Sequence, residues 1–227
     1  MEKNSIALDG PAGAGKSTLA RMVSKRYGLI YLDTGALYRC VGLYALKSNT
    51  ASKDEAGVVR LLPEINIEMS YDDAGVQRMF LNGEDVTDEI RLPEVAGYAS
   101  DVSAMPPVRS FLLSMQQDMA VKYDVIMDGR DIGTVVLPDA GLKVFLTAEL
   151  ETRAMRRHLE LIEKKIDTSF DEVLKDMGIR DKNDSERATA PLKPAVDSVL
   201  LDTTQIDLGE SFNALCALIE QRLPGFG

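Results

Sequence analysis

The sequence has no tryptophan, one histidine and two cysteines among its 227 residues, and each scarcity excludes a kind of site. Without tryptophan, nothing indicates an aromatic platform for a sugar or a nucleic acid. Cys40 and Cys216 lie in apolar, helix-like stretches without metal-ligand spacing, so we expect two buried free thiols in a reducing compartment. The sequence shows no Ser–His or Cys–His pairing of the kind that activates a covalent nucleophile, and we expect His158 at the surface.

The chain also lacks an excess of basic residues and a long apolar run. It has 36 acidic and 26 basic side chains, a formal net charge of -10, so we expect no nucleic-acid partner. A small anionic substrate is compatible with this charge, because a few converging arginines are enough to bind it. No apolar stretch approaches about 18 residues, and the first residues form too short a run for a signal peptide. We therefore expect a cytoplasmic protein with no membrane partner and, since no apolar stripe is left over, a monomer.

Short apolar runs alternate with helical patterns along much of the chain. The first run ends in Asp9-Gly10, and the helix after the glycine-rich segment is expected to end at Gly28. A second helix is predicted through Leu46. This alternation predicts a parallel sheet with helices on both faces. The predicted strands are residues 5–8, 29–32, 125–127, 143–146 and 198–201.

Two segments interrupt the alternation. From Pro63, apolar residues flank turns at residues 72–75 and at Asn82-Gly83, which is β-hairpin chemistry. Helices are predicted after it, at residues 93–104 and 108–121. Later, Ser169 and Glu172 form a capping box before an apolar stripe that is expected to end at Gly178. A last helix is predicted over residues 211–223.

Residues 10–17 read GPAGAGKS and satisfy the phosphate-loop pattern G-x-x-x-x-G-K-[ST] between a predicted strand and a helix. Glycines let backbone N–H groups point at phosphates, and the positive end of the following helix adds to the attraction. We expect Lys16 to reach the β- and γ-phosphates and Ser17 to place its hydroxyl on Mg²⁺. The predicted fold class is α/β, a P-loop three-layer fold with a central parallel sheet, a small β-rich insert and a helical lid. The predicted ATP-binding residues are Gly10, Pro11, Ala12, Gly13, Ala14, Gly15, Lys16, Ser17, Thr18 and Arg157.

Candidate acceptor residues follow two of the predicted strands. Thr34 and Tyr38 are four residues apart, on one helical face with Arg39 beside them, and such a set suits a phosphate. The sequence Asp128-Gly129-Arg130-Asp131 ends a later strand, where P-loop enzymes place the aspartate that organises Mg²⁺. Asp128 is our candidate for that role, and Arg130 and Asp131 are expected to project into the cleft.

Arginines recur at helical spacing further along the chain. Arg153, Arg156 and Arg157 form one set, and Arg180, Asp184 and Arg187 form another. Next to a phosphate loop, these sets indicate a mobile lid that brings positive charge to the transferring phosphoryl group when it closes. An acceptor that is itself a phosphate is already an anion near pH 7 and needs no general base.

The residues leave other functions open. A regulatory GTPase needs an N-K-x-D motif, which is absent, and the D-x-x-G match at residues 72–75 lies in the hairpin segment. A kinase acting on a sugar or a shikimate-like acid would need a base, which Asp33 could supply. A nucleotide-sensing protein would not need so many acceptor-side arginines.

Six stretches, in order and at their spacing, resemble the bacterial cytidylate kinases (CMP kinases) of the nucleoside monophosphate kinase family over essentially the whole chain. The stretches are IALDGPAGAGKSTLA, YLDTGALYR, the segment 63–91 with LNGEDVTDEIR, PPVR, DGRDIGTVVLPDA and RDKNDSERATAPL. The resemblance implies direct in-line phosphoryl transfer from ATP to CMP or dCMP, with Mg²⁺, giving CDP or dCDP. It also implies a P-loop core of residues 1–62, 93–151 and 188–227, a β-rich insert of residues 63–92 and a lid of residues 152–187.

The resemblance further implies a role for each matching residue. The CMP phosphate is assigned to Thr34, Tyr38, Arg39, Arg130 and Arg187. Cytosine is assigned to Ser100, Arg109 and Asp131, and the ribose hydroxyls to Arg180 and Asp184. The catalytic set is Lys16, Arg39, Arg130 and Arg187, and the metal set is Ser17 and Asp128. Thr34 stands where the family often has serine, so it keeps the hydroxyl and adds a methyl group.

Overall fold

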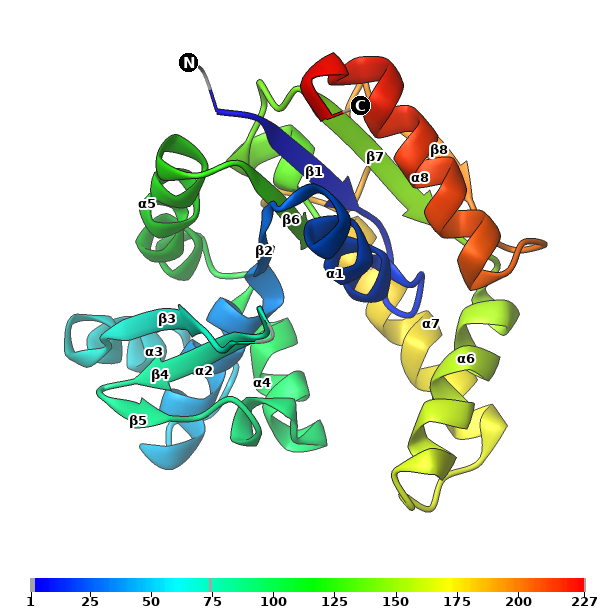
Figure 1. The fold of residues 1–227 in the computed structure, drawn as a ribbon. Helices are drawn as coiled ribbons and strands as arrows, with labels where there is room; N and C mark the ends of the chain where they lie inside the picture. Colours follow the sequence, from blue (N-terminus) through cyan, green and yellow to red (C-terminus); the bar gives the residue numbers. More distant parts are fainter. Residues whose placement is uncertain (1–2, 74, 227) are drawn as a thin grey trace. The chain divides into compact units, whose positions relative to one another are not determined.

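A computed structural model describes residues 3–73 and 75–226, which form two compact units. The first unit comprises residues 1–31 and 123–227, and the second comprises residues 32–122. Figure 1 shows the chain coloured from its N-terminus to its C-terminus, and each unit is described here by itself. In the turn predicted at residues 72–75, Ala74 lies outside the described residues. The division into core, insert and lid made from the sequence stays a proposal.

The first unit is built on a five-stranded sheet in the order β2-β6-β1-β7-β8. β1 pairs in parallel with β6 on one side and with β7 on the other, and β7 pairs in parallel with β8. The carboxyl ends of these strands therefore meet at one edge of the sheet, which confirms the predicted α/β class with a central parallel sheet. The strand bounds are β1 (Ser5–Asp9), β2 (Ile30–Asp33), β6 (Val125–Gly129), β7 (Leu142–Thr147) and β8 (Val199–Asp202).

Helices α1 (Lys16–Tyr27) and α8 (Leu208–Arg222) pack on each other and on this sheet (Figure 1). Their apolar faces join the strands in one core, in which Leu8, Val144 and Leu215 are fully or almost fully buried. Gly28 ends α1 with φ 69°, and its N–H donates to the Ser24 carbonyl, as expected for a C-terminal glycine. Cys216 is buried in this core as a free thiol. Cys40 is also a buried free thiol, in the core of the second unit.

Helices α6 (Leu150–Glu163) and α7 (Phe170–Glu186) form a hairpin in the first unit. Ser169 and Glu172 make the predicted capping box. The predicted end at Gly178 is wrong, because α7 continues through this residue to Glu186. Glycine inside a helix costs about 1 kcal/mol. Here α7 packs along α6, and Asp181 and Asp184 of its second half are paired with Arg153 and Arg130.

Helix α6 exposes an apolar stripe that the sequence analysis did not anticipate. Met155, Leu159 and Ile162 are 45%, 53% and 52% exposed, and their spacing of four and three residues places them on one face. The statement that no apolar stripe is left over is therefore wrong, because the small core of the hairpin uses other positions of α6, such as Ala154. The monomer stays a prediction without this support. None of the helices in the described ranges is both long enough and apolar enough to cross a membrane.

The second unit combines helices with a small antiparallel sheet in the order β3-β4-β5, which confirms the predicted β-hairpins. Asn82 and Gly83 have φ of 50° and 86°, and this pair of positive values makes the tight turn between β4 and β5. Helix α3 was not predicted, although Asp54 accepts the Gly57 N–H as its N-cap. The strands are β3 (Ile67–Tyr71), β4 (Gln77–Leu81) and β5 (Glu84–Asp85), and the helices are α2 (Thr34–Lys47), α3 (Glu55–Leu61), α4 (Pro93–Val102) and α5 (Pro106–Lys122).

Helices α2 and α4 make the most extensive helix–helix contact of this unit, and Gly42 lies where they come closest. A Cβ atom at Gly42 would lie 3.0 Å from the backbone nitrogen of Ala99 and 3.0 Å from Cβ of Tyr98. Protein interiors are close-packed, so the facing backbone has little room to move. The close approach of the two helices therefore depends on the absence of a side chain at this position.

We predict that Gly42→Ala lowers the free energy of unfolding by about 1–3 kcal/mol, since the added methyl group overpacks the contact between α2 and α4. The matched control is Gly97→Ala in α4, where an added Cβ atom meets nothing within 4 Å. This control should be neutral or raise stability by up to about 1 kcal/mol, because alanine is the better helix former. Urea unfolding of both variants measures the difference, and equal stability of the two would contradict the packing argument.

Candidate active site

The glycine-rich loop joins β1 to α1 and packs closely on neighbouring strands and helices of the first unit. Gly10 has φ 150°, and a Cβ atom there would lie 1.9 Å from the carbonyl oxygen of Leu146 in β7. Gly13 and Gly15 have φ of 72° and 91°, which side chains other than glycine rarely adopt. The absence of side chains at these glycines therefore lets the backbone curl tightly, as the sequence motif predicts for a loop that binds phosphate.

The amine of Lys16 lies inside the curl of the loop. Its Nζ donates to the carbonyl oxygens of Gly10 and Pro11, at 2.8 and 2.7 Å, and the side chain is buried. Burial lowers the pKa of Lys16, and the positive charge of Arg130 lowers it further, whereas Asp128 and Asp9 act in the opposite direction. The buried ammonium group thus sits at the centre of the loop, where an incoming phosphate would give it a compensating charge.

Ser17 and Asp128 lie together, as expected of residues that would share a metal ion. The Ser17 hydroxyl donates to Oδ2 of Asp128 at 2.7 Å, and the Tyr31 hydroxyl donates to Oδ1 at 3.0 Å. Sequence analysis assigned Tyr31 only to a buried strand and missed this contact. A tyrosine near the carboxyl end of that strand was the only signal that could have indicated it.

The oxygen atoms of Ser17 and Asp128 are hard ligands of the type that Mg²⁺ prefers. In the described part of the chain, no group of three or more histidine, cysteine or acidic side chains could form a metal cage of its own. Mg²⁺ in nucleotide sites is usually held by one or two protein oxygens together with phosphates and water. The Ser17–Asp128 pair fits that pattern.

Asp9, the last residue of β1, is a buried carboxylate that the sequence analysis treated only as the entry to a turn. Its Oδ1 accepts the Ile132 N–H at 2.8 Å, and its Oδ2 accepts the Gly133 N–H at 2.7 Å. Burial raises the pKa of Asp9 to about 6, against the lowering effect of these two hydrogen bonds. Asp131 raises the pKa further and Lys16 lowers it. The residue therefore connects the strand before the phosphate loop with the segment that carries Arg130 and Asp131.

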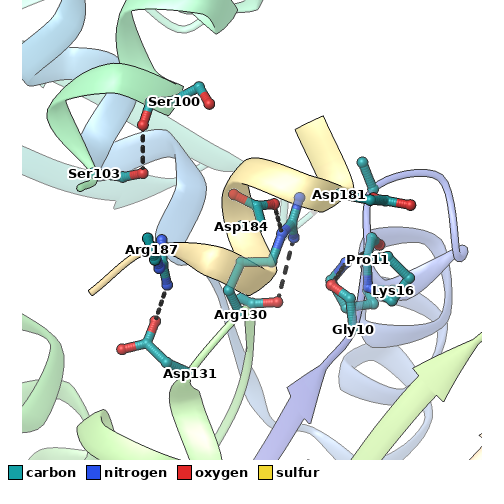
Figure 2. A network of polar contacts seen from close by, with 12 residues as sticks. Gly10, Pro11, Lys16, Ser100, Ser103, Arg130, Asp131, Asp181, Asp184 and Arg187 are labelled. Atoms are coloured by element: carbon teal, nitrogen blue, oxygen red, sulfur yellow. Dashed lines mark hydrogen bonds and ion pairs between the residues drawn. The ribbon is translucent and has the colours of Figure 1, made fainter. Parts of the chain in front are cut away.

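Two ion pairs link that segment to α7 and to the residue that follows it (Figure 2). Arg130 donates from Nε to Oδ2 of Asp184 at 2.7 Å, and an Nη atom of Arg187 lies 3.4 Å from Oδ1 of Asp131. Arg187 also donates from Nε to the Ala190 carbonyl at 2.7 Å. The structure thus brings four of the predicted acceptor residues, Arg130, Asp131, Asp184 and Arg187, into one cluster.

Arginines dominate the electrostatics of this cluster. Burial alone would raise the pKa of Asp184, but the charge and hydrogen bond of Arg130 hold it below its ordinary value, with help from Arg180 and Arg187. Asp184 is therefore a carboxylate at neutral pH. Arg180 precedes it by one turn of α7, as the spacing of four residues predicted.

The first predicted set of lid arginines divides into residues with different surroundings. Arg153 is buried, and it donates to the carbonyls of Ala148 and Ala12 and pairs with Asp181 at 2.7 Å. Arg156 donates to the backbone and hydroxyl of Thr203. Arg153 and Arg156 thus have partners within the first unit, and the role of the three arginines in a lid stays a prediction. Arg157 is half-exposed and pairs with Glu160, and its predicted contact with ATP stays a prediction.

His158 was expected at the surface, but it is half-buried within the helical hairpin. Its ring meets Phe170 of α7 edge-on, with centroids 6.2 Å apart. The helical position alone could not indicate this contact, because it depends on how α6 and α7 pack. The contact is one of packing, and it gives the histidine no catalytic partner.

The remaining predicted acceptor residues belong to the second unit. Thr34 and Tyr38 are buried on α2, and the guanidinium of Arg109 lies over the Tyr38 ring, 5.7 Å from its centroid. Arg109 also donates to the Ser103 carbonyl, and the Ser103 hydroxyl donates to the Ser100 carbonyl. Arg39 follows Tyr38 on the same helix, half-buried. Within this unit the structure thus connects Tyr38 with Arg109, an arrangement that the sequence did not predict.

Asp33 is engaged in structural contacts at the start of α2. Its Oδ1 accepts the Ala36 N–H at 3.1 Å as the helix N-cap, and its Oδ2 pairs with Arg91 at 3.0 Å. Both oxygens therefore already have partners. This engagement disfavours Asp33 as a general base for a hydroxyl acceptor.

Comparison with known proteins gives one consistent result. The family model described as cytidylate kinase matches residues 6–221. The chain is 50% identical over 210 residues to a cytidylate kinase of Caldicellulosiruptor bescii, covering 92% of each chain. It is 45% identical over 217 residues to a cytidylate kinase of Thermosipho melanesiensis, covering 96% of this chain and 97% of the relative.

Among solved structures, an uncharacterised protein of Eubacterium ventriosum aligns with a TM-score of 0.55 at 14% identity. The alignment covers 97% of this chain and 99% of that one, and it shows a similar fold. The family match, by contrast, spans the phosphate loop, the segment after β6 and the arginines of α7. The chain belongs to the cytidylate kinase family.

Proposed function

We propose that the protein transfers the terminal phosphoryl group of ATP to the phosphate of CMP or dCMP, forming CDP or dCDP by direct in-line transfer. The observation that carries the proposal is the buried Lys16 within a tightly curled phosphate loop, in a chain 50% identical over 210 residues to a protein named cytidylate kinase. Phosphoryl transfer needs positioning and charge stabilisation more than covalent chemistry. The residues of this site supply both.

On the donor side, backbone N–H groups of the loop and the start of α1 would bind the β- and γ-phosphates. Lys16 would exchange its carbonyl contacts for phosphate oxygens, whose negative charge stabilises the charged form that burial disfavours. Ser17 and Asp128 would hold Mg²⁺, which supplies neutralisation of phosphate charge when it is bound. Arg157 is the proposed additional contact to ATP.

On the acceptor side, the proposed CMP phosphate ligands are Thr34, Tyr38, Arg39, Arg130 and Arg187. The phosphate oxygen is an anion near neutral pH, with a second pKa of about 6, so it can attack without a general base. The arginines would offset the repulsion between two phosphates, and Arg130 and Arg187 already lie in one cluster of the first unit. The engagement of Asp33 with Ala36 and Arg91 further disfavours a sugar or shikimate-like acceptor.

The proposed reader of the base is Asp131, with Ser100 and Arg109, while Arg180 and Asp184 would bind the ribose hydroxyls. A carboxylate can accept a hydrogen bond, directly or through an arginine, that favours the amino group of cytosine over the oxygen of uracil. A buried acceptor that faces a carbonyl costs about 1–3 kcal/mol. That cost corresponds to roughly ten- to hundredfold discrimination.

We propose residues 152–187 as the lid, residues 63–92 as the insert on the acceptor side, and the cytoplasm as the location of the protein. Closure of the lid would exclude water from the transferring phosphoryl group. Arg153 binds the phosphate-loop carbonyl of Ala12 and Asp181 of α7, so it can couple the base of the lid to the loop.

The substrate assignment is tested by one coupled assay with ATP and, in parallel, CMP, dCMP, UMP and AMP. We predict that CMP and dCMP give the highest kcat/KM, because Asp131 favours the cytosine amino group. Omission of Mg²⁺ should abolish turnover of all four. Equal kcat/KM for AMP and CMP would contradict the assignment, and so would turnover of none of them.

We predict that Arg187→Ala lowers kcat about a hundredfold or more and changes the KM for ATP less than about threefold. Arginines at the transferring phosphoryl group contribute mainly in the transition state, and their loss costs 10³-fold or more in related enzymes. Steady-state kinetics at saturating CMP separate the two parameters. Arg26→Ala is the control, because Arg26 pairs with Glu220 at the surface of the first unit, and it should behave as the wild type.

We predict that Asp131→Ala lowers the ratio of kcat/KM for CMP to that for UMP by roughly ten- to hundredfold, for the reason given above. The two acceptors are measured side by side with the same enzyme preparation, so partial unfolding cancels from the ratio. Asp131→Asn is the matched variant, since its amide can donate to uracil, and it should shift the ratio further towards UMP. An unchanged ratio in both variants would exclude Asp131 from base selection.

A further inference from the structure

Asp9 holds both ends of the two-residue segment that carries Arg130 and Asp131. At one end, the backbone of Asp9 is in register with Gly129 in the pairing of β1 with β6. At the other end, the Asp9 carboxylate accepts the N–H groups of Ile132 and Gly133 at 2.8 and 2.7 Å. Residues 130 and 131 therefore form a short bridge: the chain before them and the chain after them both contact the same residue of β1, Asp9.

The second anchor replaces a cap that Asp131 itself would ordinarily supply. Ile132 and Gly133 begin a helical turn, η3 (Ile132–Val136), and its first N–H groups have no partner within the turn. Aspartate at the N-cap usually accepts such an N–H with its own side chain. Asp131 occupies the N-cap but makes no side-chain cap bond, and its carboxylate pairs with Arg187 instead.

The surroundings of Asp9 leave no substitute for this bond. Asp9 is 4% exposed, so water does not readily replace the carboxylate as the acceptor of the two N–H groups. Gly133 is packed tightly as well, since a Cβ atom there would lie 3.1 Å from the Lys143 side chain and 3.4 Å from Oδ2 of Asp9. Loss of the Asp9 carboxylate would leave two buried donors without this acceptor, and Asp131 occupies the N-cap, from which an aspartate usually accepts such an N–H.

We propose that Asp9 is a positioning residue for acceptor recognition: it caps η3 in place of Asp131 and so keeps the Asp131 carboxylate directed at the base and at Arg187. The inference rests on the proposed function, because it assigns the selection of cytosine to Asp131. Burial raises the pKa of Asp9 to about 6, so near pH 7 the residue is mainly the carboxylate that two N–H donors require. Without Asp9, Asp131 turns back to cap its own helical turn and selectivity is lost.

A double-mutant cycle with Asp9→Ala, Asp131→Ala and the combined variant tests this role, with the CMP to UMP ratio of kcat/KM as the readout. We expect Asp9→Ala to lower the ratio at least about tenfold, and the double variant to have the same ratio as Asp131→Ala alone. Asp9→Asn, which keeps one acceptor oxygen, should give an intermediate ratio. A support role limited to the phosphate loop would instead raise the KM for ATP and lower turnover of both acceptors equally, and that result would overturn the proposal.

Asp207→Ala is the matched control within the same unit. Asp207 also accepts a backbone N–H, that of Glu210 at 2.8 Å, as the N-cap of α8. Its removal takes away a helix cap without touching the segment after β6, so the ratio should stay within about twofold of the wild type. A fall as large as that of Asp9→Ala would show that loss of any cap changes selectivity, and would overturn the specific role.

Amide hydrogen exchange separates this inference from the proposed function, because it requires no turnover. In the wild type, the N–H groups of Ile132 and Gly133 should be protected. In Asp9→Ala the exchange of both should be at least about tenfold faster, while that of strand amides in β6 is unchanged. If the wild type does not phosphorylate CMP but this difference is found, the proposed function fails and the capping by Asp9 stands. Equal exchange of Ile132 and Gly133 in both proteins overturns the capping itself.

Discussion

The central position of β1 is the constraint on which the site of the first unit depends. Because β1 pairs in parallel with both β6 and β7, the loops that follow all three strands leave the sheet at the same edge. The phosphate loop follows β1, β6 contains Asp128 near its end and is followed by Arg130 and Asp131, and β7 is followed by Ala148 and Arg153. Their mutual contacts, such as those of Ser17 with Asp128 and of Ala12 with Arg153, are consequences of strand order.

The arginines of this unit are held by carboxylates, which is how an acidic protein can present positive charge at one place. Arg130 with Asp184, Arg153 with Asp181 and Arg187 with Asp131 are three such pairs, and each has a largely buried arginine. Buried ion pairs add little net stability, since desolvation offsets most of the attraction. Their contribution is to fix the guanidinium groups in place, so that these side chains lose their conformational entropy on folding and not when a phosphate binds.

Much of the fold could be predicted from the sequence, because local signals and tertiary contacts agree there. Three signals that act within a few residues were placed correctly: the helix end at Gly28, the capping box at Ser169 and the turn at Asn82-Gly83. The predicted end of α7 at Gly178 was wrong, because a local cost of about 1 kcal/mol does not by itself end a helix that packs along a neighbouring helix. The exposed stripe of α6 was missed for a similar reason, since spacing defines a face but not what covers it.

The candidate site shows the same division between motif and geometry. Lys16, Ser17 and Asp128 could be proposed from the sequence because a fixed spacing or the end of a strand marks them, and the structure brings Ser17 and Asp128 together. Asp9 and Tyr31 could not, because each acts on a residue more than ninety positions away, and nothing local distinguishes Asp9 from an ordinary turn residue. Arg153 and Arg157 lie one turn apart on the same helix, yet one binds the phosphate loop and the other pairs with Glu160 in solvent.

Strand order also explains why Asp9, rather than another acceptor, can cap the turn after Asp131. A carboxylate at the end of the central strand reaches over the neighbouring strand to the first N–H groups beyond it. One from β8, at the far edge of the sheet, would start two strands away from β1. The same register that places Asp9 beside Gly129 sets the length of the bridge between them and Ile132. The bridge is too short to shift along β1, so Arg130 and Asp131 are fixed with respect to the phosphate loop that begins one residue after Asp9. In this arrangement, the strand that leads into the phosphate loop also determines where the proposed acceptor residues of the same unit lie.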